Sequence, residues 1–258
     1  MREFLVANHL NDIILIPDDF KFIGKASKVR RAVNNVNSCE HTLISGDTGC
    51  GKTTLIQGLS ALTNKPLYTI NGNKNTSSEA FLGFNTLTDN EIEFVTGLAI
   101  RAMTTGGILY VDETNTVKEN VLTILYPILD GRGEVYNDFT GEFVVARKGF
   151  VFFGSYNPGY AGTNEISAAL IGRTLGLKLG YMSSQELEAY LTRLEPSIDP
   201  IMLKKLSAIF KLLTENLGGI ELPAAAKSTR HIISLVSKLK DNRQTLAESL
   251  RPWQSKPL

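Results

Sequence analysis

Residues 46–53 read Gly46-Asp47-Thr48-Gly49-Cys50-Gly51-Lys52-Thr53 and match the pattern GxxxxGK[ST], known as a P-loop. An apolar run precedes this stretch, and residues of helical composition follow it from Thr54. Glycines let backbone N–H groups curl around a β-phosphate, and the N-terminus of the next helix favours negative charge there. We therefore expect residues 46–54 to bind ATP, with Lys52 at the β- and γ-phosphates and the Thr53 hydroxyl on Mg²⁺.

A second chemical signal is an apolar run that ends in two carboxylates, Ile-Leu-Tyr-Val-Asp-Glu at residues 108–113. Buried carboxylates are costly unless they are paired or bound to metal. Asp112, at the end of the expected strand, suits a Mg²⁺ ligand acting through water, and Glu113 suits the polarisation of the attacking water. Together with the P-loop, this Walker B pattern predicts a hydrolase that converts ATP and water to ADP and phosphate.

The runs around these motifs predict an α/β fold. Short apolar runs rich in β-branched or aromatic residues indicate buried strands, and stretches able to form helices lie between them. Strands that alternate with helices favour a parallel sheet with helices on both faces. The expected strands are 41–45, 67–71, 108–112 and 150–157, the expected helices include 53–62 and 118–129, and polar hairpins are expected at 86–97 and 133–148.

The composition changes after about residue 181, where a small all-helical domain is expected. Ser183 and Glu186 have the spacing of a capping box, which begins a helix. Asp199-Pro200 opens another helix with apolar residues at helical spacing, and Ser228 caps a third. We therefore divide the chain into a nucleotide-binding domain over residues 1–182 and a helical lid domain over residues 183–258.

Composition limits the other classes of protein. An apolar fraction of 43% and a charged fraction of 21% exclude disordered and collagen-like chains. The net charge of +1 creates no overall attraction to nucleic acid. Two cysteines, Cys39 and Cys50, cannot build a disulfide framework. No apolar run approaches the roughly 18 residues of a membrane span, so a soluble cytoplasmic protein without membrane insertion is expected.

A family resemblance rests on residues 152–162, Phe-Phe-Gly-Ser-Tyr-Asn-Pro-Gly-Tyr-Ala-Gly, which follow the Asp-Glu pair by some 45 residues. This arrangement resembles the MoxR class of AAA+ ATPases, and within it the branch that includes CbbQ, NorQ and NirQ. The similarity runs from about residue 42 to residue 181 and returns at 228–230. Residues 75–83, 106–110 and 125–130 are similar as well.

The resemblance implies a three-layer α-β-α AAA+ domain with a lid, assembled as a hexameric ring with ATP at the subunit interfaces. It places Asn157 at the sensor-1 position, which orients the attacking water. It places Arg173 at the arginine-finger position, supplied to the neighbour's ATP, and Arg230 at the sensor-2 position of the lid. The chain departs from the family at Thr174, where a phenylalanine usually follows the finger.

Three functions remain open at this stage. The leading one is a motor that remodels or activates a protein complex; the resemblance implies a chaperone or activase with a von Willebrand factor A domain partner, and clients such as Rubisco or nitric oxide reductase in its branch. The second is a scaffold that is assembled by ATP binding and turns over little. The third is a DNA-acting AAA+ protein, against which the near-neutral charge argues.

Overall fold

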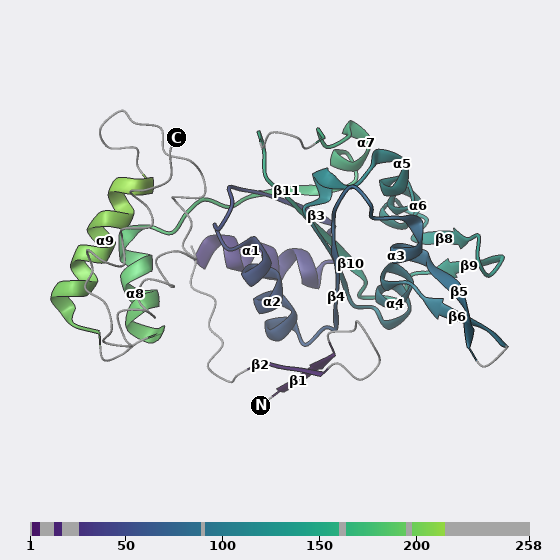
Figure 1. Ribbon diagram of the computed structural model, residues 1–258, viewed down its shortest axis with the longest axis horizontal. Helices are drawn as coiled ribbons and strands as arrows, with labels where there is room; N and C mark the ends of the chain where they lie inside the picture. Colours follow the sequence, from purple (N-terminus) through teal and green to yellow (C-terminus); the bar gives the residue numbers. More distant parts are fainter. Residues whose placement is uncertain are drawn as a thin grey trace. The chain divides into compact units, whose positions relative to one another are not determined.

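A computed structural model (Figure 1) describes residues 2–5, 13–16, 26–88, 91–159, 164–194 and 198–214. The chain divides into two compact units. The first lies within Met1–Gly46 and Lys52–Leu179, and the second within Asp47–Gly51 and Gly180–Leu258. The two units are described separately.

A five-stranded, all-parallel sheet forms the centre of the first unit. The predicted strands and the predicted α/β fold are confirmed, and no strand end differs from its predicted position by more than one residue. A parallel sheet of this kind requires crossover connections, which the intervening helices provide. In spatial order the strands are β11 (Leu175–Lys178), β3 (Thr42–Ser45), β10 (Val151–Tyr156), β7 (Ile108–Asp112) and β4 (Leu67–Asn71).

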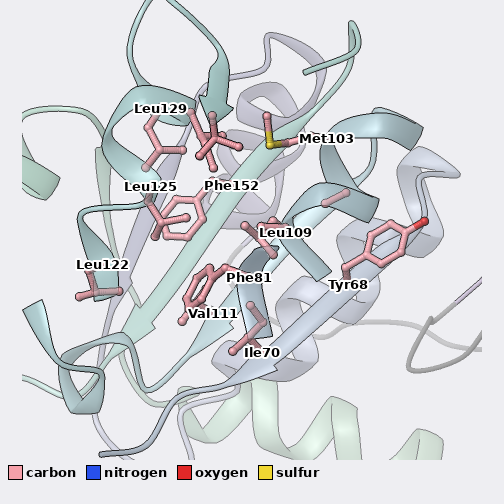
Figure 2. Packing of buried hydrophobic residues seen from close by; sticks show 14 of the residues in the cluster. Tyr68, Ile70, Phe81, Met103, Leu109, Val111, Leu122, Leu125, Leu129 and Phe152 are labelled. Atoms are coloured by element: carbon pink, nitrogen blue, oxygen red, sulfur yellow. The ribbon is translucent and has the colours of Figure 1, made fainter. Parts of the chain in front are cut away.

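Both faces of the sheet are covered, because β7 and β10 are almost continuous apolar runs whose successive side chains point to opposite faces. Leu109 and Val111 of β7 point into one hydrophobic cluster together with Phe152 of β10 and Phe81 (Figure 2). The helices over this face are α3 (Ser78–Leu82), α4 (Leu98–Thr105), α5 (Glu119–Leu122) and α6 (Leu125–Leu129). The helices that pack on the other side are α1 (Ala26–Asn37) and α2 (Lys52–Thr63).

Two antiparallel hairpins extend the first unit, as the sequence predicts. The first joins β5 (Gly83–Thr88) to β6 (Glu91–Thr96), and the second joins β8 (Glu134–Asn137) to β9 (Glu142–Val145). Both hairpins carry exposed apolar side chains, including Leu87, Ile92 and Phe143. A third antiparallel pair is formed near the N-terminus by β1 (Arg2–Leu5) and β2 (Ile13–Ile16).

The structure corrects the single helix predicted over residues 118–129, which is divided into α5 and α6. Pro127 is the physical reason, because it has no N–H to donate to the Thr123 carbonyl four residues earlier. The Thr123 carbonyl accepts from the Tyr126 N–H instead, at 3.1 Å, and the helical path tightens between the two pieces. Sequence analysis also missed β11, an edge strand of four residues, three of them exposed.

The described part of the second unit contains two helices, α8 (Ser184–Leu194) and α9 (Pro200–Thr214), which pack through Leu187, Leu191, Leu206 and Phe210. The predicted capping box is present: the Ser183 N–H donates to Glu186 Oε2 at 2.7 Å, and the Glu186 N–H donates to Ser183 Oγ at 3.2 Å. The predicted third helix from Ser228 lies outside the described residues. Among the described helices, none has the length and hydropathy that a membrane crossing needs.

Candidate functional site

Three neighbouring strands of the sheet end beside one another and bring several of the predicted site residues of the first unit together. β3, β10 and β7 are adjacent and parallel, so their carboxyl ends meet at one edge of the sheet. Gly46 follows β3, Asp112 is the last residue of β7, and Asn157 follows β10. Ligands of open α/β sheets bind at this edge, so the fold positions these residues for binding.

Lys52, the P-loop lysine, is buried at the start of α2, with 9% of its surface exposed. Its ammonium donates to the Gly46 carbonyl at 2.7 Å and to Asn157 Oδ1 at 2.5 Å. A buried ammonium is costly unless acceptors surround it, and a phosphate is a stronger acceptor than an amide oxygen. The predicted lysine and the predicted sensor-1 asparagine are therefore adjacent in space.

Asp112 receives a hydrogen bond on each carboxylate oxygen. Thr53 Oγ1 donates to Oδ2 at 2.9 Å, while Ser155 Oγ and the Glu113 N–H, at 3.0 Å, donate to Oδ1. A hydroxyl and a carboxylate in contact are hard oxygen ligands of the kind that Mg²⁺ takes together with nucleotide phosphates. These residues fit a phosphate-bound Mg²⁺, and Thr53 and Asp112 would hold it.

No cluster of three or more histidine, cysteine, aspartate or glutamate side chains with metal-ligand geometry occurs in the described part of the chain. The donor set at Thr53 and Asp112 is thus too small to hold a metal without further ligands. Mg²⁺ usually keeps several waters and binds through one or two carboxylates plus substrate phosphates. The site is consistent with an ion that arrives with a nucleotide.

Glu113, the predicted catalytic carboxylate, adopts the left-handed backbone conformation with φ 50° and is exposed. This region is unfavourable for residues other than glycine, at a cost of about 1 kcal/mol or more, and such strained residues are enriched at active sites. The 3₁₀ turn η1 (Thr114–Thr116) follows directly, and the Thr116 N–H donates to the Glu113 carbonyl at 2.8 Å. The chain therefore reverses at Glu113 and presents its carboxylate to solvent.

The P-loop residues 47–51 belong to the second unit. Gly49 and Gly51 have φ values of 78° and 92°, which only glycine adopts without strain. Cys50 is buried, and its N–H donates to the Asp47 carbonyl at 3.3 Å. Tyr181, which sequence analysis did not select, donates its hydroxyl to the Thr48 carbonyl at 3.3 Å, and burial raises its pKa to about 12. Asp47 is exposed, as is Thr54 in the first unit.

Arg173, the predicted arginine finger, lies two residues after α7 (Ala168–Ile171). Its Nη1 donates to the Ala169 carbonyl at 2.8 Å, and its guanidinium carbon lies 4.9 Å from the centre of the Tyr126 ring. Its Nε is buried without a hydrogen-bond partner among the described residues. The structure thus holds Arg173 against its own subunit and leaves part of its donor capacity unused. Arg230, the predicted sensor 2, lies outside the described residues.

Asn115 is a further polar residue near the site that sequence analysis did not select. It is buried, and its Nδ2 donates to the Asn157 carbonyl at 3.3 Å, while its carbonyl accepts from the Asn164 N–H at 2.9 Å. Asn115 therefore joins the turn after Glu113 to the end of β10 and to the segment before α7. Its place two residues after the Asp-Glu pair is the one sequence signal that could have identified it.

A cavity of about 400 Å³ lies beside Asn115, bordered by η1, α5 and residues 164–167. Its lining mixes charged, polar and apolar side chains. None of the predicted site residues in the described part of the chain lines it, so we do not assign the nucleotide to this cavity.

Comparison with known proteins is consistent with this geometry. The family model of the AAA domain, dynein-related subfamily, matches residues 41–174. An uncharacterized protein of Staphylococcus saprophyticus is 35% identical over 201 residues, which cover 76% of each chain. The uncharacterized protein YojN of Bacillus subtilis is 30% identical over 229 residues, which cover 81% of this chain and 75% of YojN.

Solved structures are similar in fold. NtrX from Brucella abortus, in complex with ADP, has a TM-score of 0.58 at 15% identity, over 88% of this chain and 52% of NtrX. At that identity the similarity extends to the fold alone.

Proposed function

We propose that this chain, which belongs to the dynein-related subfamily of AAA domains, binds ATP with Mg²⁺ and hydrolyses it. The observation that carries the proposal is the hydrogen bond from Thr53 Oγ1 to Asp112 Oδ2 at 2.9 Å. It joins the residue that follows the P-loop lysine to the carboxylate of a separate strand, 59 residues later. A P-loop and a Walker B strand need this pairing to share one metal.

Each residue of the site has a different role in the proposed hydrolysis. Lys52 is within hydrogen-bond distance of Asn157, so both can face the same γ-phosphate and the water that attacks it. Glu113, exposed beyond the end of β7, accepts the proton of that water as general base. When bound, Mg²⁺ would neutralise charge on the phosphate oxygens. The protein contributes position and charge, which account for most of the catalysis of phosphoryl transfer.

We further propose that the chain works as a ring, with Arg173 supplied to the ATP of the neighbouring subunit. The support for this is the resemblance, which places Arg173 at the arginine-finger position. We retain the MoxR-type function, remodelling or activation of a protein complex with a von Willebrand factor A domain partner. The support for it is the resemblance of residues 42–181 together with the family membership.

The test of hydrolysis is the substitution Glu113→Gln, with Glu119→Gln as the matched control. Glu119 is an exposed carboxylate at the start of α5, six residues away. Glu113→Gln should bind ATP with wild-type affinity and lose at least about 100-fold in kcat, since general-base catalysis contributes about 10²–10⁴-fold. Glu119→Gln should turn over at the wild-type rate. Wild-type turnover by Glu113→Gln would show that the assigned role is wrong.

The scaffold hypothesis has one observation in its favour. Arg173 contacts the Ala169 carbonyl and the Tyr126 ring, so its guanidinium is already engaged within its own subunit. A scaffold that uses ATP binding alone would show a rate per subunit that does not change with protein concentration. A motor with trans fingers would gain activity as the subunits assemble.

A further inference from the structure

We infer that Tyr110 and Ser155 are positioning residues for the metal-ligating carboxylate Asp112. This inference rests on the proposed Mg²⁺-dependent function. The three side chains form one directional chain of hydrogen bonds: the Tyr110 hydroxyl donates to Ser155 Oγ at 2.9 Å, and Ser155 Oγ donates to Asp112 Oδ1. A hydroxyl has one proton, so a serine that gives its proton to the carboxylate can still accept from the tyrosine.

The register of the sheet creates this chain. β7 and β10 are parallel neighbours, with Tyr110 opposite Phe153 and Val111 opposite Gly154. Continuing that register places Ser155 opposite Asp112. Tyr110 precedes Asp112 by two residues, so both side chains leave the strand on the same face. The bond chain therefore joins Tyr110 and Asp112 of β7 to Ser155 of the strand beside it.

Burial protects the hydrogen bonds of Tyr110 and Ser155 from competition with water. Tyr110 is 1% exposed and Ser155 is fully buried, so water cannot replace either hydroxyl. When a buried donor or acceptor loses its partner, no hydrogen bond offsets the free energy that its desolvation costs. Asp112 is thus held on its Oδ1 side by the buried Ser155 hydroxyl as well as by the Glu113 N–H, while its Oδ2 side meets Thr53.

The two carboxylate oxygens have different partners. The Thr53 hydroxyl donates its proton to Asp112 Oδ2 and would hold an ion through a lone pair while keeping that bond. The Ser155 bond to Oδ1 is a second side-chain constraint on the rotation of the carboxylate. Partners of this kind orient metal ligands, and their loss typically costs about 10–100-fold in metal affinity.

Tyr110→Phe and Ser155→Ala test the inference, with Tyr68→Phe as the matched control. Tyr110→Phe removes one hydroxyl and keeps the buried ring, and Ser155→Ala removes the bond to Asp112 directly. Tyr68 is a buried tyrosine of the adjacent strand β4 and is not part of the bond chain. The measurement is calorimetric binding of ADP over a series of Mg²⁺ concentrations, with the melting temperature of each nucleotide-free variant.

The Mg²⁺ midpoint is the Mg²⁺ concentration that produces half of the metal-dependent change in ADP affinity. Ser155→Ala should raise this midpoint by about 10-fold and Tyr110→Phe by about 3-fold. ADP affinity without metal should stay within about 2-fold, and Tyr68→Phe should match the wild type. A Mg²⁺ midpoint unchanged in both variants, or an equal loss of ADP binding with and without metal, would overturn the inference. Wild-type protein that binds no ADP, or binds it without regard to Mg²⁺, would instead contradict the proposed function.

Discussion

At the scale of single residues, His41 shows how burial sets a charge state. Its Nδ1 accepts a hydrogen bond from the Phe152 N–H at 3.1 Å, and its ring centre lies 5.8 Å from that of Phe150. An accepting Nδ1 requires the neutral tautomer with the proton on Nε2. Burial lowers the pKa of His41 from 6.5 to about 4, so the folded protein resists protonation there.

This lowered pKa predicts that His41 makes the fold sensitive to acid. Between about pH 6.5 and about pH 4 the His41 imidazole is protonated in the unfolded chain but neutral in the folded chain. The free energy of unfolding therefore falls as the pH decreases through this window. The loss from this one group at pH 5 should be about 2 kcal/mol. His41→Gln, which does not titrate, should lose less free energy of unfolding between pH 7.5 and pH 5, as measured with denaturant. An equal loss in both proteins would contradict the assignment.

At the scale of elements, the five-residue helix α3 attaches the β5–β6 hairpin to the body of the first unit. Its Phe81 is fully buried against residues of the sheet and of α4 (Figure 2). β5 begins directly after α3, at Gly83, whose φ of 117° suits glycine, and a Cβ added there would lie 2.4 Å from the Val95 carbonyl oxygen. A helix this short is not stable by itself, so its position depends on the packing of Phe81.

Phe81→Ala should therefore destabilise the first unit strongly. Removal of a buried phenylalanine ring costs about 3–5 kcal/mol, because the cavity that remains does not collapse fully. The control is Phe143→Ala in β9, where the ring is 66% exposed and the expected loss is below about 1 kcal/mol. Urea unfolding of both variants measures the difference. Similar midpoints for the two variants would argue against the core position of Phe81.

At the scale of the whole molecule, the proposed ring divides each active site between two subunits. Lys52 and Glu113 serve the nucleotide of their own subunit, and Arg173 serves the neighbour's. A trans arginine is worth about 10³–10⁵ in rate, so hydrolysis would depend on assembly. In this proposal each active site needs residues from two subunits. Two inactive variants that lack different residues can therefore restore activity when they are mixed.

Mixing two inactive variants tests this division. Glu113→Gln and Arg173→Ala should each hydrolyse ATP at least about 100-fold more slowly than the wild type. A mixture should recover a measurable part of the rate, because an Arg173→Ala subunit beside a Glu113→Gln subunit receives an intact arginine. The control mixture of Glu113→Gln with Lys52→Ala should stay inactive. Both residues act on the nucleotide of their own subunit, so every active site in this mixture lacks one of them. A mixture with no recovery would contradict a trans role for Arg173.

The sequence by itself determined the parallel α/β fold, the two hairpins, the capping box at Ser183 and the candidate P-loop and Walker B residues, because local patterns encode these features. It did not reveal β11, whose residues are largely exposed, or the break at residues 123–124 between α5 and α6. Only the tertiary structure joined Tyr110 to Ser155 and Asn115 to Asn157, since these contacts cross 45 and 42 residues of chain. Strand order and register create them, and single-sequence periodicity carries no information about which strands are neighbours.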